Sequence, residues 1–281
     1  MPDCFIDAVT DSLKLFPFLF LIYLFLEAVE HSSRVKAFNE KVGKGKLAPL
    51  GAGLVSLVPE CGFSVMAASL FSKGIIALGT LLTVFIVTSD EGIPILLASS
   101  HTAKVVLPIM AIKFCFGVIV GFFCNAIFKT EREQKAAEER EFHDHNCHEK
   151  TKLQIYFTMP LLRTLKVLLF VFIVNLAMNL LIFFVGEETF LTFLGQRKLL
   201  QILIAPMVGV IPGCGSSVIL ATAYQDGVLS FSALLSGLTV NSGIGLSVLF
   251  RQNKNLKQNL VILFTLYGLS ILLGLVLMLF E

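Results

Sequence analysis

The feature that most constrains this fold is a short motif that occurs twice inside apolar tracts. Residues 58–65 read VPECGFSV, and residues 211–218 read IPGCGSSV. Proline cannot donate a backbone hydrogen bond and glycine weakens a helix, so each copy is expected to interrupt a helix. In hydrocarbon, an interrupted backbone is tolerated only where protein or a water-filled cavity satisfies its polar groups. The fold therefore has to enclose both breaks.

The composition is that of an integral membrane protein. Of the 281 residues, 56% are hydrophobic and 15% are charged, whereas soluble domains average about 45–50% and about 25%. Helical crossings need about 20 apolar residues. In the first half the candidate tracts are Leu13–Ala28, Leu47–Phe71, Ile75–Ser100 and Val105–Phe128. We expect an all-α membrane protein with two membrane repeats, residues 1–128 and 153–281, joined by a hydrophilic, His-bearing cytoplasmic linker at residues 129–152.

The second half repeats the first at a constant offset of 153 residues. Aligning residues 59–92 with residues 212–245 without a gap gives 12 identities in 34 positions. Pro, Cys and Gly recur in register, which chance matches between apolar stretches do not readily produce. A second break follows each motif, reading VTSDEG at residues 87–92 and VNSGIG at residues 240–245.

The distribution of basic residues predicts that the two repeats are inverted. Residues 31–46 carry five Lys or Arg and one Glu, whereas the corresponding residues 186–198 carry two basic and two acidic residues. Residues 99–104 carry one Lys, and the corresponding residues 251–257 carry three basic residues and no acid. Because basic loops stay in the cytoplasm, the reversal in both pairs indicates opposite orientations. We expect the first loop and the linker inside and both termini outside.

Broken helices at matching positions of an inverted repeat are typical of the central site of a secondary transporter. The expected helix breaks lie at Pro59, Gly62, Pro212 and Gly215. Ionisable residues in an apolar tract indicate a functional site by default, and residues 90–91 are adjacent acids. The predicted metal ligands, all at or beside the breaks, are Asp90, Glu91, Glu60, Cys61, Cys214, Ser89, Asn241 and Ser242. The alternatives are acids solvated at the membrane surface and cysteines that only pack at a tight turn.

The types of these side chains favour a transition-metal ion. Carboxylate, amide and carbonyl oxygens suit Mn²⁺ or Mg²⁺, and thiolates select softer ions. The second copy has Gly243 and Ile244 where the first has its two acids, so the first half is expected to supply the negative charge. The linker also carries potential metal ligands, at His143, His145, Cys147 and His148. That tract is either a metal-collecting or metal-sensing segment or a solvated connector.

The stretches PECG, TSDEG, IPGCGSS and VNSG, in this order and with a His-bearing linker between the halves, resemble a bacterial family of ten-transmembrane heavy-metal exporters. That family is related by name to the arsenical permeases and is also labelled a manganese transporter. The resemblance covers essentially the whole chain. It implies a fold of ten membrane elements, five in each half, in the bacterial inner membrane, and export of a divalent metal, with Mn²⁺ favoured.

The expected function is therefore export of a divalent transition-metal cation by proton-coupled alternating access. The alternative is export of arsenite or organoarsenicals, in which Cys61 and Cys214 would be indispensable and Asp90 dispensable. An enzyme is not expected, because the apolar spans contain no histidine to act as a base. A metal-sensing receptor would not need the duplicated breaks. ATP drive is not expected either, because the chain contains no ATP-binding loop motif.

The expected partners are the metal ion and the lipid bilayer, with no resident cofactor. The net charge of +2 is too small and too scattered to indicate a nucleic-acid partner. Whether the protein is a monomer or a homodimer is left open.

Overall fold

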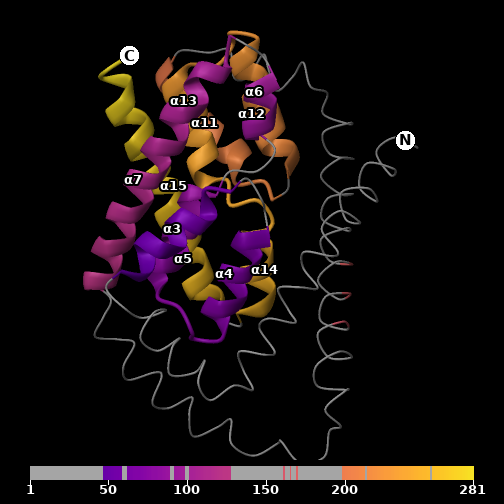
Figure 1. Ribbon diagram of the computed structural model, residues 1–281, viewed down its shortest axis with the longest axis vertical. Coiled ribbons are helices and arrows are strands. Elements are labelled where there is room, and N and C mark those ends of the chain that lie inside the picture. Colours follow the sequence, from indigo (N-terminus) through magenta and orange to yellow (C-terminus); the bar gives the residue numbers. More distant parts are fainter. Residues whose placement is uncertain are drawn as a thin grey trace, which may run out of the picture.

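The computed structural model of the chain describes residues 47–58, 62–88, 92–98, 101–127, 198–212, 214–253 and 255–281, together with residues 161, 165 and 169. The helices of the first half are α3 (Ala48–Ser56), α4 (Gly62–Ser72), α5 (Leu78–Val87), α6 (Gly92–Ala98) and α7 (Ala103–Ile127). Those of the second half are α11 (Lys198–Gly209), α12 (Cys214–Gln225), α13 (Phe231–Val240), α14 (Gly245–Gln252) and α15 (Leu256–Met278). The described chain contains no strand, and the all-α membrane fold class is confirmed (Figure 1).

The break between α13 and α14 has a clear local cause. Asn241 leaves the helical conformation, with ψ at 99°. Its side-chain oxygen accepts a hydrogen bond from the backbone N–H of Gly243 at 2.8 Å, a local turn that Asn readily forms. Gly243 has a φ of 57°, a left-handed conformation that favours glycine. Together, the side chain of Asn241 and the glycine end α13 inside an apolar tract.

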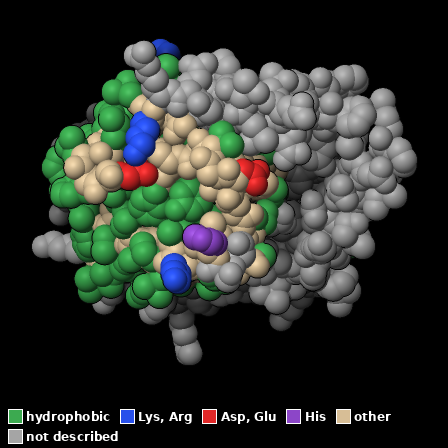
Figure 2. Space-filling model, turned by 90° about the horizontal axis from the view of Figure 1, so that it is seen from above, with side chains coloured by type: hydrophobic (Ala, Val, Ile, Leu, Met, Phe, Trp, Pro, Cys, Tyr) green, Lys and Arg blue, Asp and Glu red, His purple; other side chains and the backbone are tan. Residues whose placement is uncertain are grey.

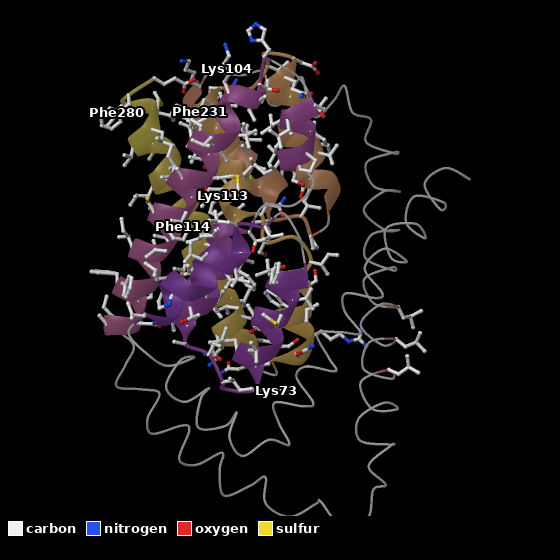
Figure 3. All side chains as sticks on the ribbon, in the orientation of Figure 1. Lys73, Lys104, Lys113, Phe114, Phe231 and Phe280 are labelled. Atoms are coloured by element: carbon white, nitrogen blue, oxygen red, sulfur yellow. The ribbon has the colours of Figure 1, made fainter. Side chains whose placement is uncertain are left out.

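The described helices on either side of the first Pro-x-Cys-Gly motif, α3 and α4, run in opposite directions. Pro49, near the start of α3, lies against Gly121, whereas Gly53, one turn later, lies against Phe114. In Figure 3, α7 descends from Lys104 through Phe114, so its later residue Gly121 lies nearer the lower end. Because α3 starts beside Gly121 and then passes Phe114, it rises from the lower end toward the middle. The chain then returns through α4 to Lys73 at the lower end (Figure 3).

The described helices on either side of the second motif, α11 and α12, are arranged in the same way at the opposite end. Gln201, in the first turn of α11, donates a hydrogen bond to the carbonyl of Val228 at 2.9 Å, just beyond the end of α12. At the other end of α11, Gly209 lies against Gly237 within α13. The start of α11 and the end of α12 thus lie near the Phe231 end, which is the upper end in Figure 3. In both halves, the two described helices that flank the motif therefore run in opposite directions.

The second tract of each half continues through its break. α5 begins after Lys73 at the lower end, and α6 leads toward Lys104 at the upper end (Figure 3). α13 begins at the upper end with Phe231. After α14, the chain rises through α15 and ends at the upper end with Phe280 (Figure 3). By length and composition, the described chain has four candidate membrane spans, at Leu78–Ala98, Ala103–Ile127, Phe231–Gln252 and Leu256–Met278. The long helices α7 and α15 run in opposite directions (Figure 3).

Helices from the two halves are interleaved. α4 packs on α14, and α6 packs on α12, so the helix that follows each Pro-x-Cys-Gly motif contacts the broken crossing of the other half. α5 and α13 are buried in the middle. α7 and α15 expose large apolar side chains, such as Leu107 at 78% and Phe264 at 68%. An exposed apolar surface of this kind marks a face that contacts a membrane or another protein. The upper end face carries a few separated Lys or Arg, Asp or Glu and His side chains among hydrophobic ones (Figure 2).

Several contacts recur at the 153-residue offset. The hydroxyl of Thr83 donates to the carbonyl of Gly117 at 3.0 Å, and the hydroxyl of Ser236 donates to the carbonyl of Ser270 at 2.8 Å. Gly74 and Gly227, in the turns after α4 and α12, have φ values of 69° and 73°. The sequence repeat is therefore accompanied by equivalent hydroxyl–carbonyl hydrogen bonds and equivalent glycine turns in the two halves.

Candidate functional site: the buried centre between the broken helices

Helices that begin beside the breaks of one half contact helices of the other half in the interior. A Cβ atom added to Gly92, at the start of α6, would lie 3.1 Å from the carbonyl oxygen of Ser217 on α12. A Cβ atom added to Gly245, at the start of α14, would lie 2.6 Å from the Cβ of Ser64 on α4. These two contacts are equivalent at the 153-residue offset. The N-terminal ends of four short helices therefore approach one another in two close crossings. A Cβ atom would clash at Gly245, and at Gly92 the neighbouring Ser217 would have to move slightly.

Neutral oxygen groups from the second half line this centre. The side-chain amide of Asn241 donates to the hydroxyl of Ser216 at 3.3 Å, and that hydroxyl donates to the carbonyl of Ile211 at 3.0 Å. Asn241, Ser242, Ser216 and Ser217 are each exposed by 3% or less. Buried polar groups are stable only when they are hydrogen-bonded, and this network ties the break after α13 to the one before α12.

A buried lysine stands between the two halves. Lys113 lies in the middle of α7 (Figure 3) and is 1% exposed. Its ammonium group donates to the carbonyl of Thr88 at 2.7 Å and to the carbonyl of Leu238 at 2.8 Å. Thr88 follows the last residue of α5, and Leu238 lies in the last turn of α13. The last carbonyls of a helix have no partner within the helix, and the ammonium group satisfies one from each half.

The two helix ends also stabilise the charge of Lys113. The C-terminal end of a helix carries roughly −0.5 elementary charge, which favours a cation nearby. Among the buried residues of the described chain, Lys113 is the only lysine, arginine, histidine or acidic residue. The other described charged or histidine side chains lie near the upper or lower end, at Lys73, His101, Lys104, Lys198, Asp226, Arg251, Lys257 and Glu281. A single positive charge thus marks the middle of the described interior.

Comparison with known families identifies the chain. The family model ArsP_2, described as "Putative, 10TM heavy-metal exporter", matches residues 3–195 and 165–281. The chain belongs to the ArsP_2 family. No curated protein matches the chain, and neither does any solved structure. The resemblance expected from the sequence motifs is confirmed, and the protein is a membrane protein of a heavy-metal exporter family.

The structure describes only part of the site predicted for this ArsP_2 chain. Asn241 and Ser242 lie in the buried centre. Gly62 is the first residue of α4, Pro212 lies between α11 and α12, and Gly215 lies in the first turn of α12. Cys214 is the first residue of α12, and its side chain is outside the described part. The predicted residues outside the described ranges are Pro59, Glu60, Cys61, Ser89, Asp90 and Glu91, with His143, His145, Cys147 and His148 of the linker. Within the described residues, no three His, Cys, Asp or Glu side chains form a metal-binding group.

Sequence reasoning missed Lys113 and Ser216. The rule that singled out the acids of residues 90–91, that an ionisable residue in an apolar tract is functional by default, applies equally to Lys113 in the tract Val105–Phe128. Ser216 belongs to the quoted IPGCGSS stretch, but no spacing rule pairs it with a residue 25 positions away. Its role depends on the contact between α12 and the end of α13.

Proposed function

We propose that this ArsP_2 protein is a secondary transporter that exports a divalent transition-metal cation, with Mn²⁺ favoured, by proton-coupled alternating access. One observation carries the proposal: helices that begin beside the breaks of one repeat contact helices of the other repeat in a buried polar centre. Secondary transporters commonly bind cargo between inverted repeats of this kind, near the middle of the membrane. The opposite directions of α7 and α15 (Figure 3) support an inverted repeat.

The proposed cargo site combines acids from the first half with neutral oxygens from the second. Asp90 and Glu91 directly precede α6, and Glu60 lies between α3 and α4 in the sequence. Asn241 and Ser242 would face them from the second half. The remaining proposed ligands are Ser89, Cys61 and Cys214. Carboxylate and amide oxygens with a minority of thiolates fit manganese, iron or zinc better than calcium.

Proton coupling follows from the same carboxylates. A carboxylate has to be deprotonated to bind a metal ion, so protonation from one side would release the cargo there. Asp90 and Glu91 are the groups proposed to exchange protons for metal. The metal ion is cargo, and no resident cofactor or enzymatic activity is proposed.

The membrane orientation is proposed from the charges at the two ends. The described basic residues at the lower end are Lys73, Arg251 and Lys257, and no described acid lies there. The upper end carries two lysines, Lys104 and Lys198, together with the acids Asp226 and Glu281. Because cytoplasmic loops are rich in Lys and Arg, we place the lower end in the cytoplasm of a bacterial inner membrane, with the linker that follows α7. Lipid is the proposed partner of α7 and α15, and no nucleic-acid partner is proposed.

The test is metal flux into proteoliposomes that hold the purified protein and a metal-sensitive dye. Mn²⁺, Zn²⁺, Ca²⁺ and Mg²⁺ are compared, with and without a pH gradient. The variants are Asp90→Asn, the double variant Cys61→Ser/Cys214→Ser, and Asp226→Asn as a matched control, because Asp226 is an exposed acid in the turn after α12. We expect Mn²⁺ flux that depends on the pH gradient, is lost in Asp90→Asn and is retained in Asp226→Asn.

Two results would contradict the proposal. If folded wild-type protein moved none of the four ions, the cation proposal would be wrong, and arsenite would be the next cargo to test. If arsenite moved, with flux lost in the double cysteine variant and kept in Asp90→Asn, the arsenical alternative would replace it.

A further inference from the structure

We propose that Lys113 is a resident cation beside the cargo site, and that its fixed positive charge weakens the binding free energy of the cargo in proportion to the cargo's own charge. A site with several acids and thiols holds a transition metal tightly, but a transporter has to release it. Transport needs binding that is weak enough for the ion to leave. The inference rests on the proposed function, because it assumes a cationic cargo.

The first argument is the position of Lys113. Its ammonium group donates to one carbonyl of each half, that of Thr88 at the end of α5 and that of Leu238 in the last turn of α13. Thr88 directly precedes Ser89 in the chain, and Leu238 is three residues before Asn241. The ammonium group therefore stands at the two helix ends from which both proposed ligand segments start.

The second argument is the matched position in the other half. Lys113 corresponds at the 153-residue offset to Leu266 on α15, which is fully buried. Leucine packs this place in the second half without any charge, so packing of the long helix does not by itself require lysine. The lysine is a feature of one half, as are the acids of residues 90–91.

The size of the effect follows from Coulomb's law. Three residues at a helix end span about 5 Å, which puts a cargo held by the Asn241 segment within about 10 Å of the ammonium group. At effective dielectric constants of about 25 to 50, a unit charge at about 10 Å weakens binding of a divalent ion on the order of tenfold to a hundredfold. A monovalent ion is affected by about the square root, threefold to tenfold. A neutral cargo is not affected.

The experiment measures the binding of cations to purified full-length protein by calorimetry. Mn²⁺ is titrated directly, and monovalent Tl⁺ is titrated as a competitor of Mn²⁺. The variants are Lys113→Gln and Lys113→Met, which remove the charge, and Lys113→Arg, which keeps it. Lys104→Gln is the matched control, because Lys104 lies on the same helix but is exposed at its upper end (Figure 3).

We expect both neutral variants to bind Mn²⁺ about 10- to 100-fold more tightly and Tl⁺ about 3- to 10-fold more tightly. Lys113→Arg and Lys104→Gln are expected to stay within about threefold of wild type. Manganese release from loaded proteoliposomes is expected to slow in the neutral variants. A purely structural lysine would not produce an effect that scales with the charge of the ion.

Unchanged or weaker Mn²⁺ binding in a folded neutral variant would overturn the inference while leaving the proposed function intact. So would unfolding of both neutral variants, judged by size-exclusion profile and melting temperature, if Lys113→Arg stayed folded. Wild-type protein that bound none of the tested metal ions would instead refute the proposed function.

Discussion

The substitution Gly245→Ala tests the close crossing of α4 and α14. An added Cβ would lie 2.6 Å from the Cβ of Ser64, 2.7 Å from its hydroxyl oxygen and 2.9 Å from its backbone carbonyl carbon. Carbon atoms in van der Waals contact lie about 3.5–4.0 Å apart. The two helices therefore have to separate by about 1 Å, because the obstacle includes backbone and not only the end of a flexible side chain.

The expected loss of stability follows from two opposing effects. Forcing an extra carbon atom into a well-packed interior costs typically about 1–3 kcal/mol, whereas alanine is favoured over glycine within a helix by up to about 1 kcal/mol. We predict a net loss of about 1–2 kcal/mol for Gly245→Ala. Gly268→Ala on α15 is the control, because an added Cβ there meets nothing within 4 Å. It is predicted to be neutral or to gain up to about 1 kcal/mol.

The measurement is the melting temperature of each variant in detergent, followed by Mn²⁺ flux in proteoliposomes. Gly245→Ala should melt below wild type, and Gly268→Ala at or above it. Gly92→Ala should lie between them, because its Cβ would meet Ser217 only at 3.1 and 3.3 Å. Equal melting temperatures for Gly245→Ala and Gly268→Ala would refute the close approach of α4 and α14 at this point.

Three further predictions address the matched turns, the central amide and the helix-bridging hydroxyls. Gly74→Ala and Gly227→Ala should each lower the free energy of unfolding by about 1–2 kcal/mol, because both glycines have left-handed backbones. An added Cβ atom would meet no neighbour at either position. Melting temperatures that fall by clearly different amounts would contradict equivalent turns. Asn241→Ala removes both described hydrogen bonds of that side chain and should lower stability by about 1–3 kcal/mol and abolish Mn²⁺ flux; a variant with wild-type flux would exclude a cargo role. Thr83→Val and Ser236→Ala each remove an interhelical hydrogen bond and should each cost about 0.5–1.5 kcal/mol; because the two sites lie in different halves, a double variant measured by thermal unfolding should show additive losses.

Much of the architecture could be predicted from the sequence because its signals are local. Apolar tracts indicate which segments enter the lipid, and proline and glycine indicate where a helix is interrupted. The break after Val240 is an example, since Asn241 and Gly243 end the helix through a turn that spans three residues. The repeat at 153 residues and the motifs in it were also sufficient to point to the family that the chain belongs to.

The candidate site could be predicted only in part. The sequence placed Asn241 and Ser242 at a break, and the structure finds both buried at the meeting point of the helices. It did not single out Lys113, whose described partners lie 25 and 125 residues away in the chain. A lysine in an apolar tract can reach toward the membrane surface or be held inside, and only the surrounding backbone decides between the two.

The sequence by itself determined the class of the protein and its family, and it predicts where the helices break, because hydropathy and backbone chemistry act within a few residues. The tertiary structure decided that the helices flanking each Pro-x-Cys-Gly motif run in opposite directions while the second tracts continue, and that α4 packs on α14 and α6 on α12. Lipid-facing and protein-facing apolar side chains have the same composition, so hydropathy cannot say which helices touch. Steric fit over long sequence separations decides it, as at Gly92 and Gly245.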